Sequence, residues 1–153
     1  MRGSRMTTAA QILLGTALLA TCSIVHVSAV ALSIPLFQRV AALVDSARRP
    51  KLRVLALLLL TIGVLLAAHT IQIWIWSVLF IAQGEFESLP ESFYFATVTY
   101  TTLGYGDIVL DSGARIVATF AAIAGLLTFG ISTAFLFGVL TRIMPDVFEG
   151  HSR

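Results

Sequence analysis

The sequence predicts an all-helical membrane protein with three transmembrane helices, a re-entrant helix and an irregular loop. The chain is 58% hydrophobic and 12% charged, whereas soluble domains are about 45–50% apolar and about 25% charged. Three apolar stretches exceed the roughly 20 residues that a helix needs to cross a bilayer. Between the last two lies a polar, glycine-containing segment, Tyr100 to Asp107. Irregular backbone is stable at membrane depth only when it is buried in protein or lines a watery path, so this segment is the candidate site.

The first predicted unit is an N-terminal segment with a transmembrane helix, residues 1–37. Its apolar stretch runs from Ile12 to Phe37. We expect the helix to end near Pro35, because proline removes a helical hydrogen bond and clashes with the preceding turn. The stretch contains no arginine, and a voltage sensor needs several within the membrane. It is therefore not predicted to sense voltage.

A secretory signal peptide is the alternative for this first helix. Arg2 and Arg5 precede the apolar stretch, and within it the segment from Val27 to Ala29 resembles the small-residue cleavage site of a signal peptide. The apolar stretch is longer than a usual signal core, which favours an uncleaved helix. We expect that helix to pack peripherally against the outer helix of its own or a neighbouring subunit.

A basic loop, residues 38–53, is predicted to follow on the cytoplasmic side. It holds five of the chain's ten Lys and Arg residues against one acid, Asp45, and short cytoplasmic loops are rich in such residues. A sharper alternative is an anionic-lipid site. The net charge of +2 is too small and scattered to indicate a nucleic-acid partner. The candidate lipid-binding residues are Arg48, Arg49, Lys51 and Arg53.

The second apolar stretch predicts an outer helix over residues 54–82. Trp74 and Trp76 lie near its far end, where amphipathic rings favour the membrane interface. His69 and Gln72 lie one turn apart and are expected to pack against a neighbouring helix, as is His26 in the first helix.

An acidic outer segment contains a short predicted pore helix, residues 90–101. Ser88 can cap this helix, Pro90 suits its first turn, and Glu91 suits its positive end. It is too short to span a membrane, so we expect it to enter from outside and to return through residues 102–107.

The third apolar stretch predicts an inner helix over residues 115–143, before a short cytoplasmic tail, 144–153. Four side chains at three- and four-residue steps share one face of this helix, which could line a pore. Ordinary helix packing is the alternative, because small residues such as glycine favour close packing in membranes. The four are Leu126, Phe129, Thr133 and Phe137.

The residue types between Thr102 and Asp107 suit the binding of a dehydrated cation. Inward-pointing backbone carbonyls replace the hydration shell of an ion, and Gly104 and Gly106 permit the backbone angles that this needs. One chain supplies only one strand of such a cage, so several copies must surround an axis.

Thr102-Leu103-Gly104-Tyr105-Gly106-Asp107 resembles the TVGYGD filter of the potassium channel family, and the resemblance covers roughly Arg53 to Ile143. It implies a homotetramer with four pore loops around one axis. It also implies K⁺ coordination by the carbonyls of Thr102, Leu103, Gly104 and Tyr105 and by the Thr102 hydroxyl, with Gly106 completing the filter. Gly125 matches the family's gating hinge and Gly130 a second family glycine. Thr133 matches a cavity-lining position, and Phe137, a turn deeper, is a candidate hydrophobic gate.

The sequence departs from the family around the filter. Leu103 replaces the commoner valine, at a position that offers its carbonyl. Tyr94 and Phe95 stand where many members have paired tryptophans, and Val98 stands where some two-helix channels carry a glutamate that pairs with the filter aspartate. Asp107 therefore needs another partner, and Tyr94 is the candidate. We expect slow filter inactivation that differs from that of the glutamate-bearing members.

The predicted function is passive, potassium-selective conduction across the cell's plasma membrane, with the filter outside and no voltage-sensor domain. The alternatives are a nonselective cation channel and a non-conducting assembly subunit with a pore-like fold. K⁺ is the expected permeant ion, and no cofactor is predicted. No nucleophile with a base and no metal-ligand cluster is evident in the sequence, so an enzyme is not predicted.

Overall fold

The computed structural model describes residues 6–44 and 49–143, and over these residues it confirms an all-helical fold. The helices are α1 (Thr8–Leu43), α2 (Pro50–Ala82), α3 (Leu89–Tyr100) and α4 (Arg115–Ile143). By length and composition α1, α2 and α4 could each cross a membrane, and the protein is an integral membrane protein.

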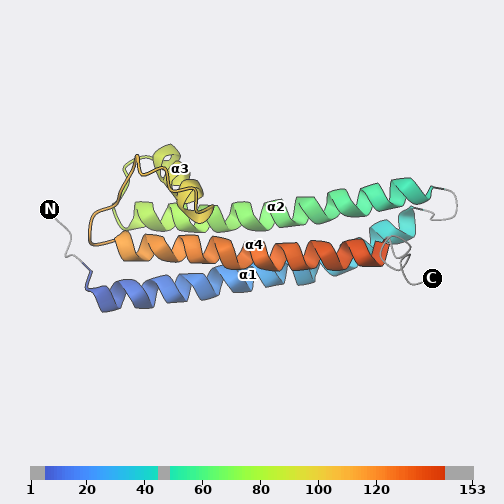
Figure 1. Cartoon of the computed structure of the whole chain (residues 1–153), viewed down its shortest axis with the longest axis horizontal. Helices are drawn as coiled ribbons and strands as arrows, with labels where there is room; N and C mark the ends of the chain where they lie inside the picture. Colours follow the sequence, from blue (N-terminus) through green and yellow to red (C-terminus); the bar gives the residue numbers. More distant parts are fainter. Residues whose placement is uncertain (1–5, 45–48, 144–153) are drawn as a thin grey trace, which may run out of the picture.

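The three long helices lie side by side, and α1 packs against both α2 and α4 (Figure 1). The short helix α3 and the loop after it lie at the end of the bundle where α1 begins. The end of α1, the start of α2 and the end of α4 lie at the opposite end. Consecutive long helices therefore run in alternating directions, as three membrane crossings require.

Helix α1 does not end near Pro35, contrary to our expectation. It continues through Pro35 to Leu43, so residues 38–43 of the predicted loop are helical. Pro35 removes one backbone hydrogen bond, but neighbouring helices and local adjustments make proline tolerable within membrane helices. The helix therefore carries Arg39 at its end.

The other helix bounds lie within a few residues of the predictions. Helix α2 begins at Pro50, four residues before the predicted start, because proline suits the first turn. Helix α3 covers 89–100 where 90–101 was predicted, and α4 covers 115–143 as predicted. The predicted tail, 144–153, lies outside the described residues, as does Arg48.

The hydrophobic core lies at the α3 end of the bundle. Phe95 of α3 contacts Phe80 and Phe86, with ring centroids 5.3 Å apart in both pairs. Trp76 is fully buried, so its ring packs inside the protein, and its predicted place at the level of the membrane interface stays a prediction. Trp74 is 43% exposed and packs on Phe93. The core therefore fixes α3 against α2.

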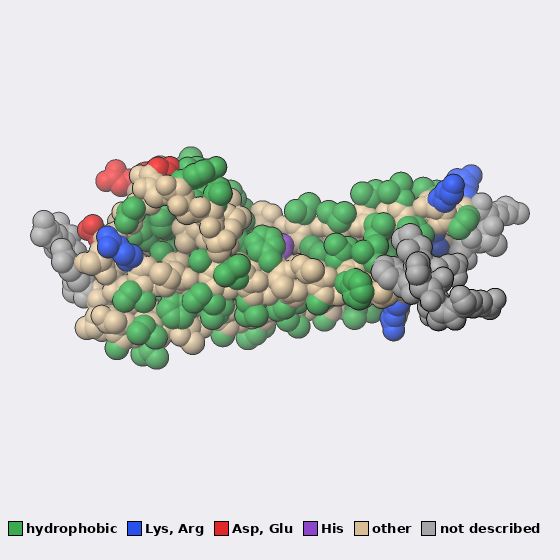
Figure 2. All heavy atoms as spheres, in the orientation of Figure 1, with side chains coloured by type: hydrophobic (Ala, Val, Ile, Leu, Met, Phe, Trp, Pro, Cys, Tyr) green, Lys and Arg blue, Asp and Glu red, His purple; other side chains and the backbone are tan. Residues whose placement is uncertain are grey.

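The surface is apolar along the long helices and charged at both ends (Figure 2). Acidic side chains gather around α3, and most of the visible Lys and Arg side chains lie at the far end. A long apolar belt between charged ends is the pattern of a protein that crosses a bilayer.

Candidate functional site

The loop after α3 has an alternating backbone conformation. Thr102, Gly104 and Gly106 have φ values of 60°, 56° and 78°, whereas Leu103 and Tyr105 between them have negative φ. Glycine adopts positive φ without strain, but threonine rarely does. Such alternation lets successive peptide groups turn toward the same side, which an ordinary strand does not allow.

The amide groups at the start of this loop bond back to the end of α3. The Val98 carbonyl accepts from Leu103 N–H at 3.0 Å and from Gly104 N–H at 3.3 Å, and Thr102 N–H donates to the Thr99 carbonyl at 3.0 Å. These bonds hold the strained φ of Thr102, as surrounding structure must at such a residue. Val98 thus supports the loop through its carbonyl, while its side chain is buried.

The loop's own carbonyl groups are left unused. Within residues 6–44 and 49–143, no hydrogen bond is accepted by the carbonyl oxygens of Thr102, Leu103, Gly104 and Tyr105. The side chains of Leu103 and Tyr105 are 54% and 66% exposed in the single chain. The loop therefore presents four carbonyl oxygens that accept no hydrogen bond within the described residues, while the amides at its start are bonded to the end of α3.

Tyr94 and Asp107 join α3 to the end of the loop. The Tyr94 hydroxyl donates to Asp107 Oδ2 at 2.7 Å, which is the contact proposed from the sequence. This bond raises the pKa of Tyr94. Phe95, by contrast, lies in the aromatic core. The contribution of Tyr94, Phe95, Val98 and Asp107 to filter stability stays a prediction.

The end of α3 is anchored by a buried hydroxyl group. The Tyr100 hydroxyl lies 2.8 Å from His69 Nδ1 and 2.7 Å from Thr128 Oγ1, and it donates to Gln72 Oε1 at 3.2 Å. The Tyr100 side chain is fully buried. Its hydroxyl therefore ties the residue just before the loop to both α2 and α4.

The same network reaches the N-terminal helix. His26 Nδ1 lies 2.9 Å from Gln72 Nε2, and His26 Nε2 lies 3.0 Å from Ser132 Oγ. Ser132 Oγ in turn lies 2.9 Å from His69 Nε2. Buried polar groups normally find hydrogen-bond partners, and here α1 supplies one of them. The N-terminal helix thus takes part in the polar network behind the loop.

A second polar contact fixes α1 near the start of α4. Gln11 is buried; its Nε2 donates to the Ser112 carbonyl at 3.2 Å, and its Oε1 accepts from Ile116 N–H at 3.2 Å. The first amides of a helix lack intrahelical partners, so Gln11 satisfies one of them. Helix α1 is therefore bonded to α4 at two levels.

Gly125 lies where the backbone of α4 closely approaches the end of α3. A Cβ atom at this position would overlap the carbonyl oxygen of Tyr100. Nothing lies within 4 Å of a Cβ built at Gly130. The close approach of α4 to the Tyr100 carbonyl is by itself enough to require a glycine at 125. The predicted role of Gly125 as a gating hinge stays a prediction.

The predicted pore-lining side chains lie on the exposed side of α4. Thr133 is exposed, and Leu126, Phe129 and Phe137 are 63%, 42% and 58% exposed in the single chain. Phe129 also stacks on His69, with ring centroids 4.3 Å apart. Gly125 is buried instead. This side of α4 is available to line a path or to meet another copy.

Sequence reasoning missed most of the polar network. The three-residue spacing of His69 and Gln72 predicted a shared face, but not their partners on α1, α3 and α4. Tyr100 was included in the candidate segment without any role for its hydroxyl. The buried Gln11 carried no signal, because a glutamine before an apolar stretch is ordinarily solvated.

The site thus combines two long helices, a short helix between them, and a loop in which the carbonyls of residues 102–105 accept no hydrogen bond within the described part of the chain. Residues 68–142 match the family model described as an ion channel, so the part of the chain from the middle of α2 to the last turn of α4 is similar to that family.

Potassium channels are similar to a part of the chain. Potassium voltage-gated channel subfamily A member 2 of Oncorhynchus mykiss is 46% identical over 50 residues, 32% of this chain and 10% of that protein. Member 10 of Gallus gallus is 48% identical over 50 residues, with the same shares, and human member 7 is 49% identical over 49 residues, 31% of this chain and 11% of that protein. The alignment covers about a tenth of the length of these curated relatives. No solved structure matches the chain significantly.

Proposed function

We propose that four copies of this chain form a potassium-selective pore in the plasma membrane. The carbonyls of Thr102, Leu103, Gly104 and Tyr105, together with the Thr102 hydroxyl, replace water around K⁺ as it passes. Gly106 ends the filter. The observation that carries this proposal is that these four carbonyls accept no hydrogen bond within the described chain, on a loop whose first three amides are bonded to α3.

Three further observations support the proposal. The C-terminal, partly negative end of α3 adjoins the loop, which favours a cation there. The Leu103 and Tyr105 side chains are exposed in the single chain, and further copies of the chain around a common axis would bury them. The relatives named above are potassium channels, and the matching residues are close to half identical.

The proposed orientation places the loop outside and the α1–α2 connection in the cytoplasm. Lys51, Arg53 and Arg142 lie at or near the ends of their helices on the latter side, and basic residues favour the cytoplasmic side. Of the candidate lipid-binding residues, Arg49, Lys51 and Arg53 lie at this end of α2 and attract anionic lipid to this surface, while Arg48 lies outside the described residues. The apolar stretch Ile12 to Phe37 holds no arginine, so we propose that α1 does not act as a voltage sensor.

Purified full-length protein in planar bilayers with opposed K⁺ and Na⁺ gradients tests the proposal. We expect currents that reverse near the K⁺ equilibrium potential. A reversal potential insensitive to K⁺ would contradict potassium selectivity, and equal permeation of both ions would indicate a nonselective cation channel. A folded protein without any current would indicate a non-conducting subunit.

A matched pair of glycine variants assigns the current to the loop. Gly104→Ala places a side chain at a φ of +56° and should abolish selective current, because alanine is strained there. Gly63→Ala makes the same chemical change within α2, where nothing lies within 4 Å of the added atom, and should leave current unchanged. Selective current in Gly104→Ala would place the filter elsewhere.

A further inference from the structure

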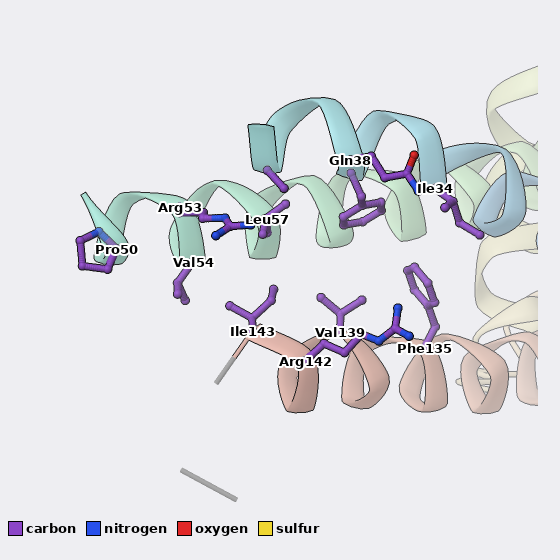
Figure 3. Close-up of a pocket in the computed structure, with 12 residues that line it drawn as sticks. Ile34, Gln38, Pro50, Arg53, Val54, Leu57, Phe135, Val139, Arg142 and Ile143 are labelled. Carbon is purple, nitrogen blue, oxygen red and sulfur yellow. The ribbon is translucent and has the colours of Figure 1, made fainter. Parts of the chain in front are cut away.

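A cavity lies between α1, α2 and α4 at the end of the bundle far from the loop (Figure 3). Its volume is about 540 Å³, within the range of about 300–1,000 Å³ that is typical of ligand sites. Each of the three helices contributes apolar side chains to its walls. The main ones are Ile34, Phe37, Val54, Leu57, Phe135 and Val139.

Two arginines, Arg53 of α2 and Arg142 of α4, line this apolar cavity. The Nε atom of Arg53 is buried and makes no hydrogen bond within residues 6–44 and 49–143. A buried donor without an acceptor is costly, and more so when it is charged. The cavity therefore offers cationic donors that an anionic ligand would satisfy.

In the orientation proposed above, the two arginines lie at the depth of the lipid headgroups. Arg53 is in the first turn of α2 and Arg142 in the last turn of α4, so both mark the edge of their membrane-spanning stretches. Leu57, Phe135 and Val139 lie one to two turns further along their helices, toward the bilayer centre. The site thus has cations at the membrane surface and apolar walls beneath them.

We propose that this cavity binds one anionic phospholipid from the leaflet at the α1–α2 connection. The phosphate accepts hydrogen bonds from Arg53 and Arg142, and an acyl chain lies along the apolar walls. A soluble anion would leave these walls in contact with water, whereas a lipid uses both parts of the site. The proposal rests on the membrane orientation given above and not on ion conduction.

Native mass spectrometry of the full-length protein in detergent, titrated with phosphatidylglycerol or phosphatidylcholine, tests this site. We expect tight binding of phosphatidylglycerol and, for Arg53→Gln, a loss of affinity of about tenfold or more, as charge-assisted hydrogen bonds predict. Arg142→Gln should also weaken binding. Arg39→Gln is the matched control, because Arg39 is exposed near the same end but does not line the cavity.

A second variant separates the cavity from the charged surface. Val139→Trp keeps every charge but fills the apolar wall, and it should weaken binding of phosphatidylglycerol while leaving folding, followed by circular dichroism, intact. Equal losses in Arg39→Gln and Arg53→Gln, unchanged binding in Val139→Trp, or equal binding of both lipids would overturn the proposal. So would competition by millimolar inorganic phosphate that displaces the lipid fully. Because binding is measured without current, the outcome does not depend on conduction.

Discussion

The Tyr94 hydroxyl of α3 donates a hydrogen bond of 2.7 Å to Asp107 Oδ2. The two residues lie on either side of residues 102–105, whose carbonyls accept no hydrogen bond within the described chain, so this bond ties the end of the loop to α3. Both side chains are exposed in the single chain, and the bond is a short, charge-assisted one.

Removing either partner of this bond should change filter inactivation. We expect Tyr94→Phe and Asp107→Asn to alter the rate of current decay during maintained K⁺ current, each several-fold and in the same direction, because each weakens the same contact. Single-channel and macroscopic recordings measure this rate. Glu87→Gln, which removes an exposed carboxylate at the same end of the bundle, should leave the rate unchanged. Unchanged inactivation in both test variants would remove this bond from filter support.

Tyr100→Phe should destabilise the protein by about 1–3 kcal/mol, because His69, Gln72 and Thr128 would lose a buried partner. Thermal unfolding in detergent measures this loss. The matched control is Tyr94→Phe, which removes an exposed hydroxyl and should cost less. If the end of α3 holds the loop, added K⁺ should raise the unfolding temperature of Tyr100→Phe less than it raises that of wild type. Equal stability of the two variants would show that the network contributes little.

Gly125→Ala should lower stability more than Gly130→Ala does. The added methyl group at 125 meets the Tyr100 carbonyl, whereas the one at 130 meets open space. A conflict with backbone forces α4 away from α3, a shift that typically costs about 1–3 kcal/mol. Unfolding midpoints of the two variants provide the comparison. Reduced channel opening in Gly125→Ala with unchanged stability would favour the hinge role over close packing.

Phe137→Ser should raise single-channel conductance or resting open probability. The exposed ring lies near the end of α4 remote from the loop, where a ring of apolar side chains could close the path by dewetting. Leu127→Ser, at an exposed position nearer the loop, is the control and should leave single-channel behaviour unchanged. Records of Phe137→Ser that match wild type would exclude Phe137 from the gate.

Glu85→Gln should flatten the pH dependence of stability in mildly acidic solution. Burial, and secondarily Asp111, raise the pKa of Glu85. Between the ordinary glutamate pKa of about 4.3 and the raised value, the folded chain binds more protons than the unfolded chain, so stability increases as pH falls. Glu85→Gln should lack this increase and be more stable than wild type at neutral pH. Melting temperatures across this pH range measure the effect, and Glu87→Gln, at an exposed carboxylate, is the control. Parallel curves of melting temperature against pH for Glu85→Gln and wild type would contradict the prediction.

The helices could be predicted from the sequence because each depends on local composition. The candidate site could be predicted only in part. Residues 115–143 are apolar between charged ends, and Pro90 with Glu91 marks the start of a short helix. The loop was recognisable from its glycines and threonines. The continuation through Pro35 was not, because it depends on neighbouring helices. The burial of Trp76 and the partners of Tyr100 were also missed, since they depend on which helix faces meet.

The two bonded levels between α1 and α4 determine what can move. Gln11 holds Ile116 and His26 holds Ser132, so α4 cannot tilt over this half of its length without either breaking these bonds or carrying α1 along. The body that moves would then be a pair of helices with a large lipid-facing perimeter. In the proposed channel, its displacement would push aside bilayer as well as protein, which would couple the work of opening to the lateral pressure of the surrounding lipid.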